Sequence, residues 1–546
     1  MTSGAPQAAA EQATPAGSTH PGHQLTGSPQ LTDCLPRRPG SMLRLGWAVP
    51  VAAAAGWLLD AAFPTIGWWP LAWVSVIVIL VCLVGRSIGG ALLVGASYGA
   101  VFYLAHLQWV ASFLGPLPWL ALVSAQTALV AAGSIVITLL YRWSTQVLPG
   151  RRPQLLLVPV LVAGAWTLRE IVMGSWPYGG FPWARLAVSQ VDGPVAESVS
   201  WTGASGLSFL MVVVCAAVVQ AVRAAAITIP AVLLPSTALI VLLVVPAFPT
   251  ATAGGLRVGW AQGNGPTGYF DDRSPGDVLV AQTAASEPIL GQTMDLLVWP
   301  EGGVDSDPLN RPTTAAALHD LVRRARAPLL VNAATARGGQ SFNTSLLWTQ
   351  AGASQLYDKV NPVPFGEYVP DRWLYERLVP DLVGLIKRDY IPGTRPPVVT
   401  VNGTVLGLAI CFDVIYDDVI WDGARRGTQA YLFQTNNADF RGTDENMQQL
   451  AFARLRAIET GRSVVNISTV GTSQVISADG SVTDQAGVDQ VAARVTNVPL
   501  RTGLTPAVVV GPALTQTLGW GTLLAFAVLG VAARRHRRAG TSGVGR

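Results

Sequence analysis

The sequence predicts a polytopic α-helical membrane bundle of about eight transmembrane helices that carries an extracytoplasmic α/β domain. Composition is the first reason. Half of the 546 residues are hydrophobic and only 12% are charged, against about 25% charged in an ordinary soluble domain. The pattern is the second: long apolar runs fill most of the chain, whereas residues 256–502 alternate short β-type runs with helical stretches.

Eight apolar runs account for the predicted bundle. Each has roughly 18 or more mostly apolar residues, enough to cross about 30 Å of hydrocarbon as a helix. They lie at 45–63, 68–85, 88–110, 118–141, 154–173, 196–222, 227–248 and 514–533. The first run contains VAAAAG, which would suit signal-peptide cleavage, but a long polar stretch precedes it and another span follows closely. We therefore expect an uncleaved helix.

Arginines orient this bundle. They precede the first span, occupy every even-numbered gap and follow the last span, at positions 37, 38, 44, 86, 142, 151, 152, 223, 534, 535, 537 and 538. The loops at 64–67 and 111–117 carry no Lys or Arg. Because basic residues stay on the cytoplasmic side, we expect both termini in the cytoplasm and residues 256–502 outside it. The inside-facing loops and the basic C-terminal tail also explain most of the net charge of +4, and nothing in the large domain predicts nucleic-acid binding.

The expected domain organisation follows from these patterns. Residues 1–40 are rich in Pro, Gly, Ser, Thr and Gln and cannot bury a core. The boundaries are 1–40 for a disordered cytoplasmic tail, 41–250 for a seven-helix transmembrane region, 256–502 for the extracytoplasmic α/β domain, 512–533 for the eighth helix and 534–546 for a basic cytoplasmic tail.

A single cysteine stands out in the α/β domain. Reactive groups of such sheets lie at the carboxyl ends of strands; DLLVWP runs into Glu301, and TVLGLAI runs into Cys411. The other cysteines are Cys34 in the tail and Cys82 and Cys215 in apolar runs. The outer domain therefore has one thiol and no internal disulfide, and a lone thiol in an oxidising compartment favours a functional role.

A carboxylate base is the remaining way to activate that thiol. The only histidine of the domain, His319, lies in an ordinary helical pattern, which argues against Cys-His and Ser-His-Asp arrangements. Lys359 is one of two lysines in the domain and lies in LYDKVNPVPFGEYVP, a stiff loop that brings Glu367 round. Glu301 lies in LLVWPEGG, where glycines allow close approach of the backbone.

The order and spacing of Glu301, Lys359 and Cys411, 58 and then 52 residues apart, resemble the carbon-nitrogen hydrolase, or nitrilase, superfamily. With seven helices before this domain and one after it, the chain resembles the apolipoprotein N-acyltransferase family, whose members complete bacterial lipoprotein maturation. The motifs that carry the resemblance are VWPEGG, FNTSLL, VPFGEYVP, GLAICFDV, QTNNADF and ARLRAIETGR.

The resemblance implies a nitrilase-like α-β-β-α sandwich and a set of site residues. It makes Cys411 the acyl-carrying nucleophile, Glu301 the general base and Lys359 the essential lysine, with Glu367 a further required glutamate. The backbone amide of Phe412 would serve the oxyanion. Many relatives have Tyr-Glu after the cysteine and Asn-x-x-Trp-Phe-Gly further on, where this chain has Phe412-Asp413 and NNADFRG. The roles of Asp413 and Asp439 therefore stay open.

The implied partners are a membrane phospholipid as acyl donor and a diacylglyceryl-modified apolipoprotein as acceptor. A multi-pass monomer in the bacterial plasma membrane is expected. No cofactor and no metal are expected, because the five histidines show no ligand spacing with cysteines and no nucleotide-binding loop is found.

Two other functions compete with this interpretation. A membrane-tethered amidase or nitrilase with water as acceptor would share the same Glu-Lys-Cys set. A transporter or receptor with an inactive nitrilase-like domain is the other alternative, but transport usually needs ionisable groups at mid-membrane. Here Asp60, Arg169, Glu170 and Glu197 lie near the ends of the predicted spans.

Two further segments suggest contact with lipid. The stretch WPYGGFPWAR, 176–185, carries aromatic residues suited to a membrane interface, although an ordinary aromatic belt explains it equally well. The stretch DRWLYERLVPDLVGLIK, 371–387, is apolar and interrupted at Pro380 and Gly384. We expect it to form a mobile arm that dips into the outer leaflet, with packing on the domain's own core as the alternative.

Overall fold

The computed structural model describes residues 40–223 and 229–542. Apart from Gly40, the predicted disordered tail of residues 1–40 lies outside the described residues, as does the end of the predicted basic tail, 543–546.

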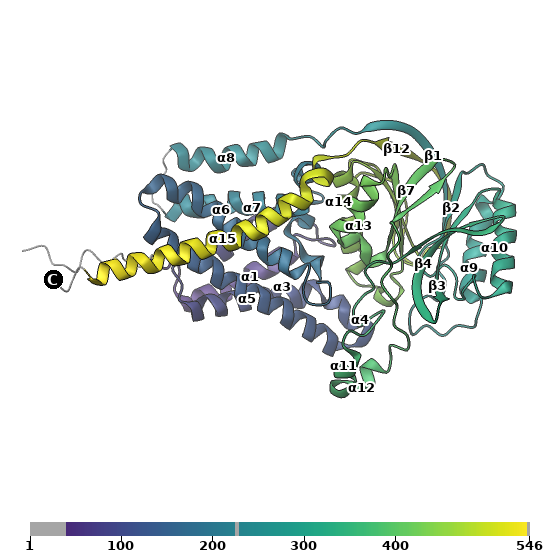
Figure 1. Cartoon of the computed structure of the whole chain (residues 1–546), viewed down its shortest axis with the longest axis horizontal. Coiled ribbons are helices and arrows are strands. Elements are labelled where there is room, and N and C mark those ends of the chain that lie inside the picture. The colour runs from purple at the N-terminus through teal and green to yellow at the C-terminus, as the bar shows by residue number, and fades with distance from the viewer. Residues whose placement is uncertain (1–39, 224–228, 543–546) are drawn as a thin grey trace, which may run out of the picture. The chain divides into compact units, whose positions relative to one another are not determined.

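In this described part of the chain, eight apolar helices form the membrane region, and each coincides with one predicted apolar run (Figure 1). They are α1 (Leu45–Asp60), α2 (Pro70–Leu83), α3 (Ile88–His106), α5 (Pro116–Val147), α6 (Arg151–Met173), α7 (Val199–Arg223), α8 (Ile229–Val244) and α15 (Pro506–Ser542). A short helix, α4 (Ala111–Leu114), lies between α3 and α5. Three 3-10 turns, Pro182–Ala184, Leu186–Gln190 and Ala196–Ser198, lie between α6 and α7.

Five of these helices, α3, α5, α6, α7 and α15, are long and apolar enough to cross a membrane, within the part of the chain that the structure describes. The other three are shorter. The 14 residues of α2 span only about 21 Å at about 1.5 Å per residue, less than the hydrocarbon thickness. The predicted membrane bundle is therefore confirmed, but the count of eight spans is not.

Two six-stranded sheets form the α/β domain, with strand orders β12-β1-β2-β3-β4-β5 and β11-β10-β9-β8-β7-β6. The strands are β1 (Ala251–Gln262), β2 (Leu296–Val298), β3 (Leu329–Arg337), β4 (Gln340–Thr349), β5 (Gly352–Asp358), β6 (Val398–Val401), β7 (Thr404–Ile410), β8 (Ala430–Thr435), β9 (Ser463–Ser468), β10 (Ser473–Ile476), β11 (Val482–Ala486) and β12 (Ala492–Thr502). The strands β1, β2 and β3 are parallel, as are β7, β8 and β9, and all other pairs are antiparallel.

The strand sequences explain why the domain has four layers. Leu296 and Val298 of β2 join a core between the two sheets, whereas Leu297 packs toward helix α10 (Pro312–Ala325). Side chains that alternate along a strand face opposite sides, and apolar residues on both sides require cover on both. Helices α9 (Asp277–Ser286) and α10 cover one sheet, and α13 (Asp417–Arg425) and α14 (Glu445–Thr460) cover the other (Figure 1). The α-β-β-α sandwich that the resemblance implies is thus confirmed.

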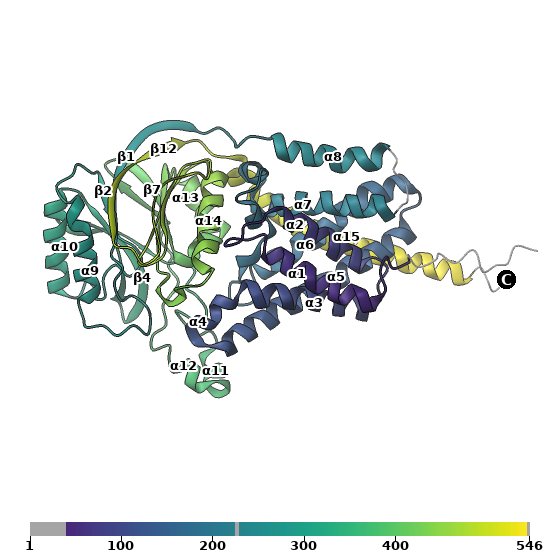
Figure 2. The same ribbon diagram turned by 180° about the vertical axis from the view of Figure 1, so that it is seen from behind.

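The helix layer of α13 and α14 faces the membrane helices, as both views show (Figure 2). Phe452 of α14 lies in the same hydrophobic core as Trp183 of the α6-α7 connection. A buried ion-pair network crosses this contact: Asp417 pairs with Arg185 of the bundle at 2.5 Å and with Arg456 of α14 at 2.8 Å. Burial alone would raise the pKa of Asp417, but the two guanidinium groups lower it to about 2. The carboxylate therefore stays charged and links bundle to domain.

Candidate active site

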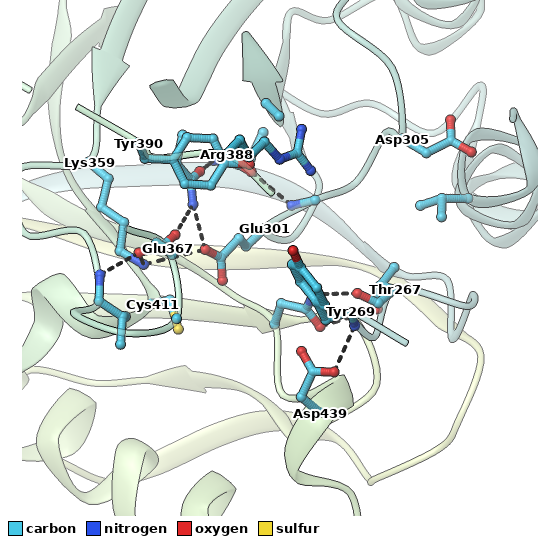
Figure 3. A pocket seen from close by; sticks show the side chains of 18 of the residues that line it. Thr267, Tyr269, Glu301, Asp305, Lys359, Glu367, Arg388, Tyr390, Cys411 and Asp439 are labelled. Atoms are coloured by element: carbon cyan, nitrogen blue, oxygen red, sulfur yellow. Dashed lines mark hydrogen bonds and ion pairs between the residues drawn. The ribbon is translucent and has the colours of Figure 1, made fainter. Parts of the chain in front are cut away.

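One cavity of about 260 Å³ collects the four ionisable residues that the sequence singled out (Figure 3). Glu301, Lys359, Glu367 and Cys411 all line it, together with Phe113 of α4. Glu301 follows β2, Lys359 follows β5 and Cys411 follows β7, so three strand ends meet at the same place. The predicted site residues are therefore brought together from segments far apart in the chain.

Cys411 occupies a strained backbone position. It follows the last residue of β7 with φ of +48° and begins a short 3-10 helix, Cys411–Ile415. Left-handed backbone is costly for a residue other than glycine and is typical of functional sites. Arg456 holds the turn in place, because its Nε and Nη2 donate hydrogen bonds of 2.9 Å to the carbonyl oxygens of Val414 and Ile415.

Lys359 lies between two carboxylates. Its Nζ is 2.8 Å from Oε2 of Glu367 and 3.6 Å from Oε1 of Glu301, and its side chain is 1% exposed. Asn343, in the FNTSLL segment of β4, donates from Nδ2 to Oε1 of Glu301 at 2.8 Å and to Oε1 of Glu367 at 2.9 Å. Glu367 also accepts the amide of Val363 at 2.7 Å. This network holds both carboxylates at fixed positions around the lysine.

Burial and charge set the protonation states of these groups. Burial alone would lower the pKa of Lys359, but the carboxylates of Glu367 and Glu301 raise it well above its ordinary value. Burial raises the pKa of Glu301 and, with the Glu301 charge, that of the Cys411 thiol. The resting site therefore holds an ammonium and a neutral thiol. The Glu301 carboxyl and the Cys411 thiol line the same cavity.

The sequence interpretation missed two polar residues of this site. Asn343 lies in a quoted motif but was not singled out. Gln449 of α14 donates from Nε2 to the Cys411 sulfur at 3.4 Å. Both residues are buried, and buried polar groups need specific partners, but only the structure shows their burial.

Asp413 and Asp439 have separate roles. Asp413 is fully buried and accepts hydrogen bonds from the Tyr357 hydroxyl at 2.8 Å and from the Asn361 amide at 2.9 Å. It therefore supports the chain on both sides of Lys359. Asp439 lines the cavity and accepts the amide of Tyr269 at 2.7 Å. Burial raises the pKa of both carboxyls.

The aromatic residues of the 176–185 segment lie partly on the surface and partly in the interior. Trp176 and Tyr178 are exposed, as an interfacial role requires. Trp183 is instead buried and donates from Nε1 to Gln448 of α14 at 2.7 Å. The Phe412 ring packs against Phe181 and Trp183, with centroids 5.7 and 6.4 Å away. The expectation of an aromatic interface is thus wrong for Trp183, which supports the turn beside Cys411.

No group of three or more His, Cys, Asp or Glu that could hold a metal ion is found in residues 40–223 and 229–542.

Comparison with known families accounts for both halves of the chain. The model of the apolipoprotein N-acyltransferase N-terminal domain matches residues 55–217, and the carbon-nitrogen hydrolase model matches residues 258–500. The chain belongs to the apolipoprotein N-acyltransferase family. An apolipoprotein N-acyltransferase of Mycolicibacterium smegmatis is 29% identical over 511 residues, which cover 86% of this chain and 83% of the relative. One from Geobacter metallireducens is 26% identical over 478 residues, 82% of this chain and 87% of the relative.

Solved structures of related proteins are similar to about half of the chain. A carbon-nitrogen hydrolase superfamily protein from Xanthomonas campestris is 22% identical, covers 49% of this chain and 97% of its own, and has a TM-score of 0.33. An amidase from Nesterenkonia is 20% identical, covers 46% of this chain and 94% of its own, and has a TM-score of 0.34.

Proposed function

We propose that the chain is an apolipoprotein N-acyltransferase that works through a thioester on Cys411. It transfers a fatty acyl chain from a membrane phospholipid to the α-amino group of the N-terminal diacylglyceryl-cysteine of an apolipoprotein. One observation carries the proposal: a Glu-Lys-Cys cavity lies in a chain that also matches the acyltransferase N-terminal domain. An enzyme that used water as acceptor would have no need of that membrane region.

In the first half-reaction Cys411 takes the acyl group. Glu301 accepts the thiol proton as the sulfur attacks the ester carbonyl, which forms the C–S bond. Lys359 and the backbone amide of Phe412 stabilise the oxyanion. The ester C–O bond then breaks, and Glu301 returns its proton to the departing lysophospholipid hydroxyl. The sulfur is left as an acyl thioester.

In the second half-reaction the neutral α-amino group of the apolipoprotein attacks the thioester carbonyl. A new C–N amide bond forms, and the C–S bond breaks. Glu301 takes a proton from the attacking nitrogen and delivers it to the sulfur. The triacylated lipoprotein leaves, and the thiol is restored for the next phospholipid.

The proposed orientation places the domain outside the cytoplasm and both termini inside, as the arginine distribution supports. Both substrates are then embedded in the outer leaflet, beside the cavity. Phe113 supports this arrangement, because it belongs to α4 of the membrane region and lines the cavity. Its ring provides an apolar surface for an acyl chain on the way to Cys411.

The 371–387 segment is the proposed lipid entry. It forms the short helices α11 (Arg372–Leu378) and α12 (Pro380–Val383). Val383 and Ile386 are buried and pack with Phe113 in a small separate core, whereas Trp373 is 63% exposed and Leu378 is 64% exposed. One face of the segment therefore anchors it near the cavity, and the other presents apolar side chains suited to lipid.

We expect Trp373→Glu and Leu378→Glu to slow acyl transfer from bilayer phospholipid at least about tenfold, because a charge on this face opposes its entry into lipid. Thermal unfolding and the alkylation of Cys411 by a small water-soluble reagent should stay as in wild type. Glu376→Gln, on the exposed surface of the same helix, is the matched control. Unfolding of the two variants, or transfer at the wild-type rate, would assign the segment to core packing.

The function itself is tested by mass spectrometry of a lipoprotein N-terminus from cells with and without this chain. Cells that carry the chain are expected to show a third acyl group, on the α-amino nitrogen. An unmodified amino terminus in both strains, together with hydrolysis of a small amide by the purified protein, would indicate the amidase instead.

A further inference from the structure

A second buried carboxyl, outside the proposed reaction, is linked to the nucleophile. Glu445 is the first residue of α14 and is 2% exposed. Asn437 donates from Nδ2 to Oε2 of Glu445 at 2.7 Å and also to Oε1 of Gln449 at 3.1 Å. Gln449 in turn donates from Nε2 to the Cys411 sulfur at 3.4 Å. Three hydrogen bonds thus connect Glu445 to the reacting sulfur.

The Glu445 carboxyl and the Ser468 hydroxyl together fix the direction of these hydrogen bonds. An amide side chain can present either its oxygen or its nitrogen. Asn437 directs its nitrogen toward Glu445 and its oxygen toward the Ser468 hydroxyl, which donates to it at 2.6 Å. Its second N–H then occupies the oxygen of Gln449, so the Gln449 nitrogen faces Cys411. An N–H donor at the sulfur stabilises a thiolate relative to a thiol.

The charge environment makes Glu445 sensitive to pH. The start of a helix favours a negative charge, but burial, opposed by the Asn437 hydrogen bond and reinforced by Glu301, raises the pKa of Glu445 to about 8. From other elements, Glu301, Lys359 and Glu367 act with Glu445 on the Cys411 thiol. On its own helix start, the preceding Asp444 is exposed, and the nearby His106 of α3 contacts Gln448 instead.

We propose that Glu445 is a positioning residue for Cys411. Acting through Asn437 and Gln449, its neutral carboxyl holds an amide N–H against the sulfur, and loss of its proton places a negative charge there that opposes thiolate formation. The inference rests on the proposed role of Cys411 as nucleophile. It adds that the reactivity of Cys411 is adjusted by Glu445, a residue of helix α14 that does not line the substrate cavity.

The test measures thiol reactivity without lipid. Full-length protein in detergent is treated with iodoacetamide across the neutral and alkaline range, and the Cys411 peptide is quantified by mass spectrometry. Glu445→Gln keeps an oxygen acceptor for Asn437 but cannot ionise. We expect it to lower the pH of half-maximal alkylation by on the order of one unit. Gln449→Met removes the N–H donor, and we expect it to raise that midpoint.

Asp444→Asn is the matched control, since it removes an exposed carboxyl one residue away, and its midpoint should equal that of wild type. An unchanged midpoint in Glu445→Gln, or equal shifts in Glu445→Gln and Asp444→Asn, would overturn the inference. Because alkylation needs neither phospholipid nor apolipoprotein, these outcomes are independent of acyl transfer. Absence of a lipid adduct in wild type would count against the proposed function alone.

Discussion

Replacing Cys411 by serine or alanine is expected to abolish acyl transfer, with a loss on the order of 10⁴ or more in rate. Alanine has no nucleophile. A serine hydroxyl has a far higher pKa than a thiol, and although burial raises the pKa of Glu301, its carboxylate remains too weak a base to generate an alkoxide. The measurement is transfer from a labelled phospholipid to a diacylated peptide, together with mass spectrometry of the lipid adduct on residue 411.

The matched control is Cys215→Ala, which removes a buried thiol of the membrane bundle and should leave transfer near the wild-type rate. Full maturation of lipoproteins by either Cys411 variant would exclude the thioester mechanism.

Glu301→Gln and Lys359→Ala are expected to have the next largest effects, each at least about 10² in rate. The amide of glutamine cannot accept the thiol proton, so acyl-enzyme should not form. Without Lys359 the thiol remains, but the oxyanion loses its cation. Because the loss also leaves the buried carboxylates of Glu301 and Glu367 unpaired, we expect a lower stability as well, by about 3–5 kcal/mol.

The pH dependence separates these two variants. Glu301 must be ionised to act, and burial raises its pKa, so wild-type acylation should decline as the pH falls through that raised pKa. Lys359→Ala should retain this acid limb, shifted to higher pH because the Lys359 charge lowers the pKa of Glu301 in the wild type, whereas Glu301→Gln should lose it. Normal trapping of a covalent lipid on Cys411 in both variants would remove Glu301 and Lys359 from the mechanism.

The parts of this protein that sequence could predict are those with local signals. Apolar runs located the apolar helices found among the described residues, and strand ends located Glu301 and Cys411, because strand periodicity and composition are properties of the segment itself. The number of helices long enough to span the membrane was harder to predict from the sequence. Helix α2 lies in an apolar run but ends at Leu83, and the length of a helix within such a run depends on the turns that neighbouring helices permit.

Local sequence patterns could not predict the contacts between segments that lie far apart in the chain. Asn343 and Gln449 lie in a regular strand and a regular helix, and only tertiary packing places their amides against Glu301 and Cys411. For Trp183, composition predicted the wrong surroundings. Its segment has the composition of a membrane interface, but the helix layer of the α/β domain covers it. Composition describes which surroundings a side chain suits, and it does not say which neighbour supplies them.

The adjacent glutamines of α14 couple the nucleophile of the α/β domain to the membrane region. Gln448 accepts the indole N–H groups of Trp109 and Trp183, whereas Gln449 donates to Cys411. Excising residues 256–502 would expose these anchors to water and free the helix that orients the nucleophile. We therefore expect the excised domain to have a less reactive thiol than the full-length protein. For the same reason, a detergent that loosens the bundle should inactivate the enzyme well before the domain unfolds.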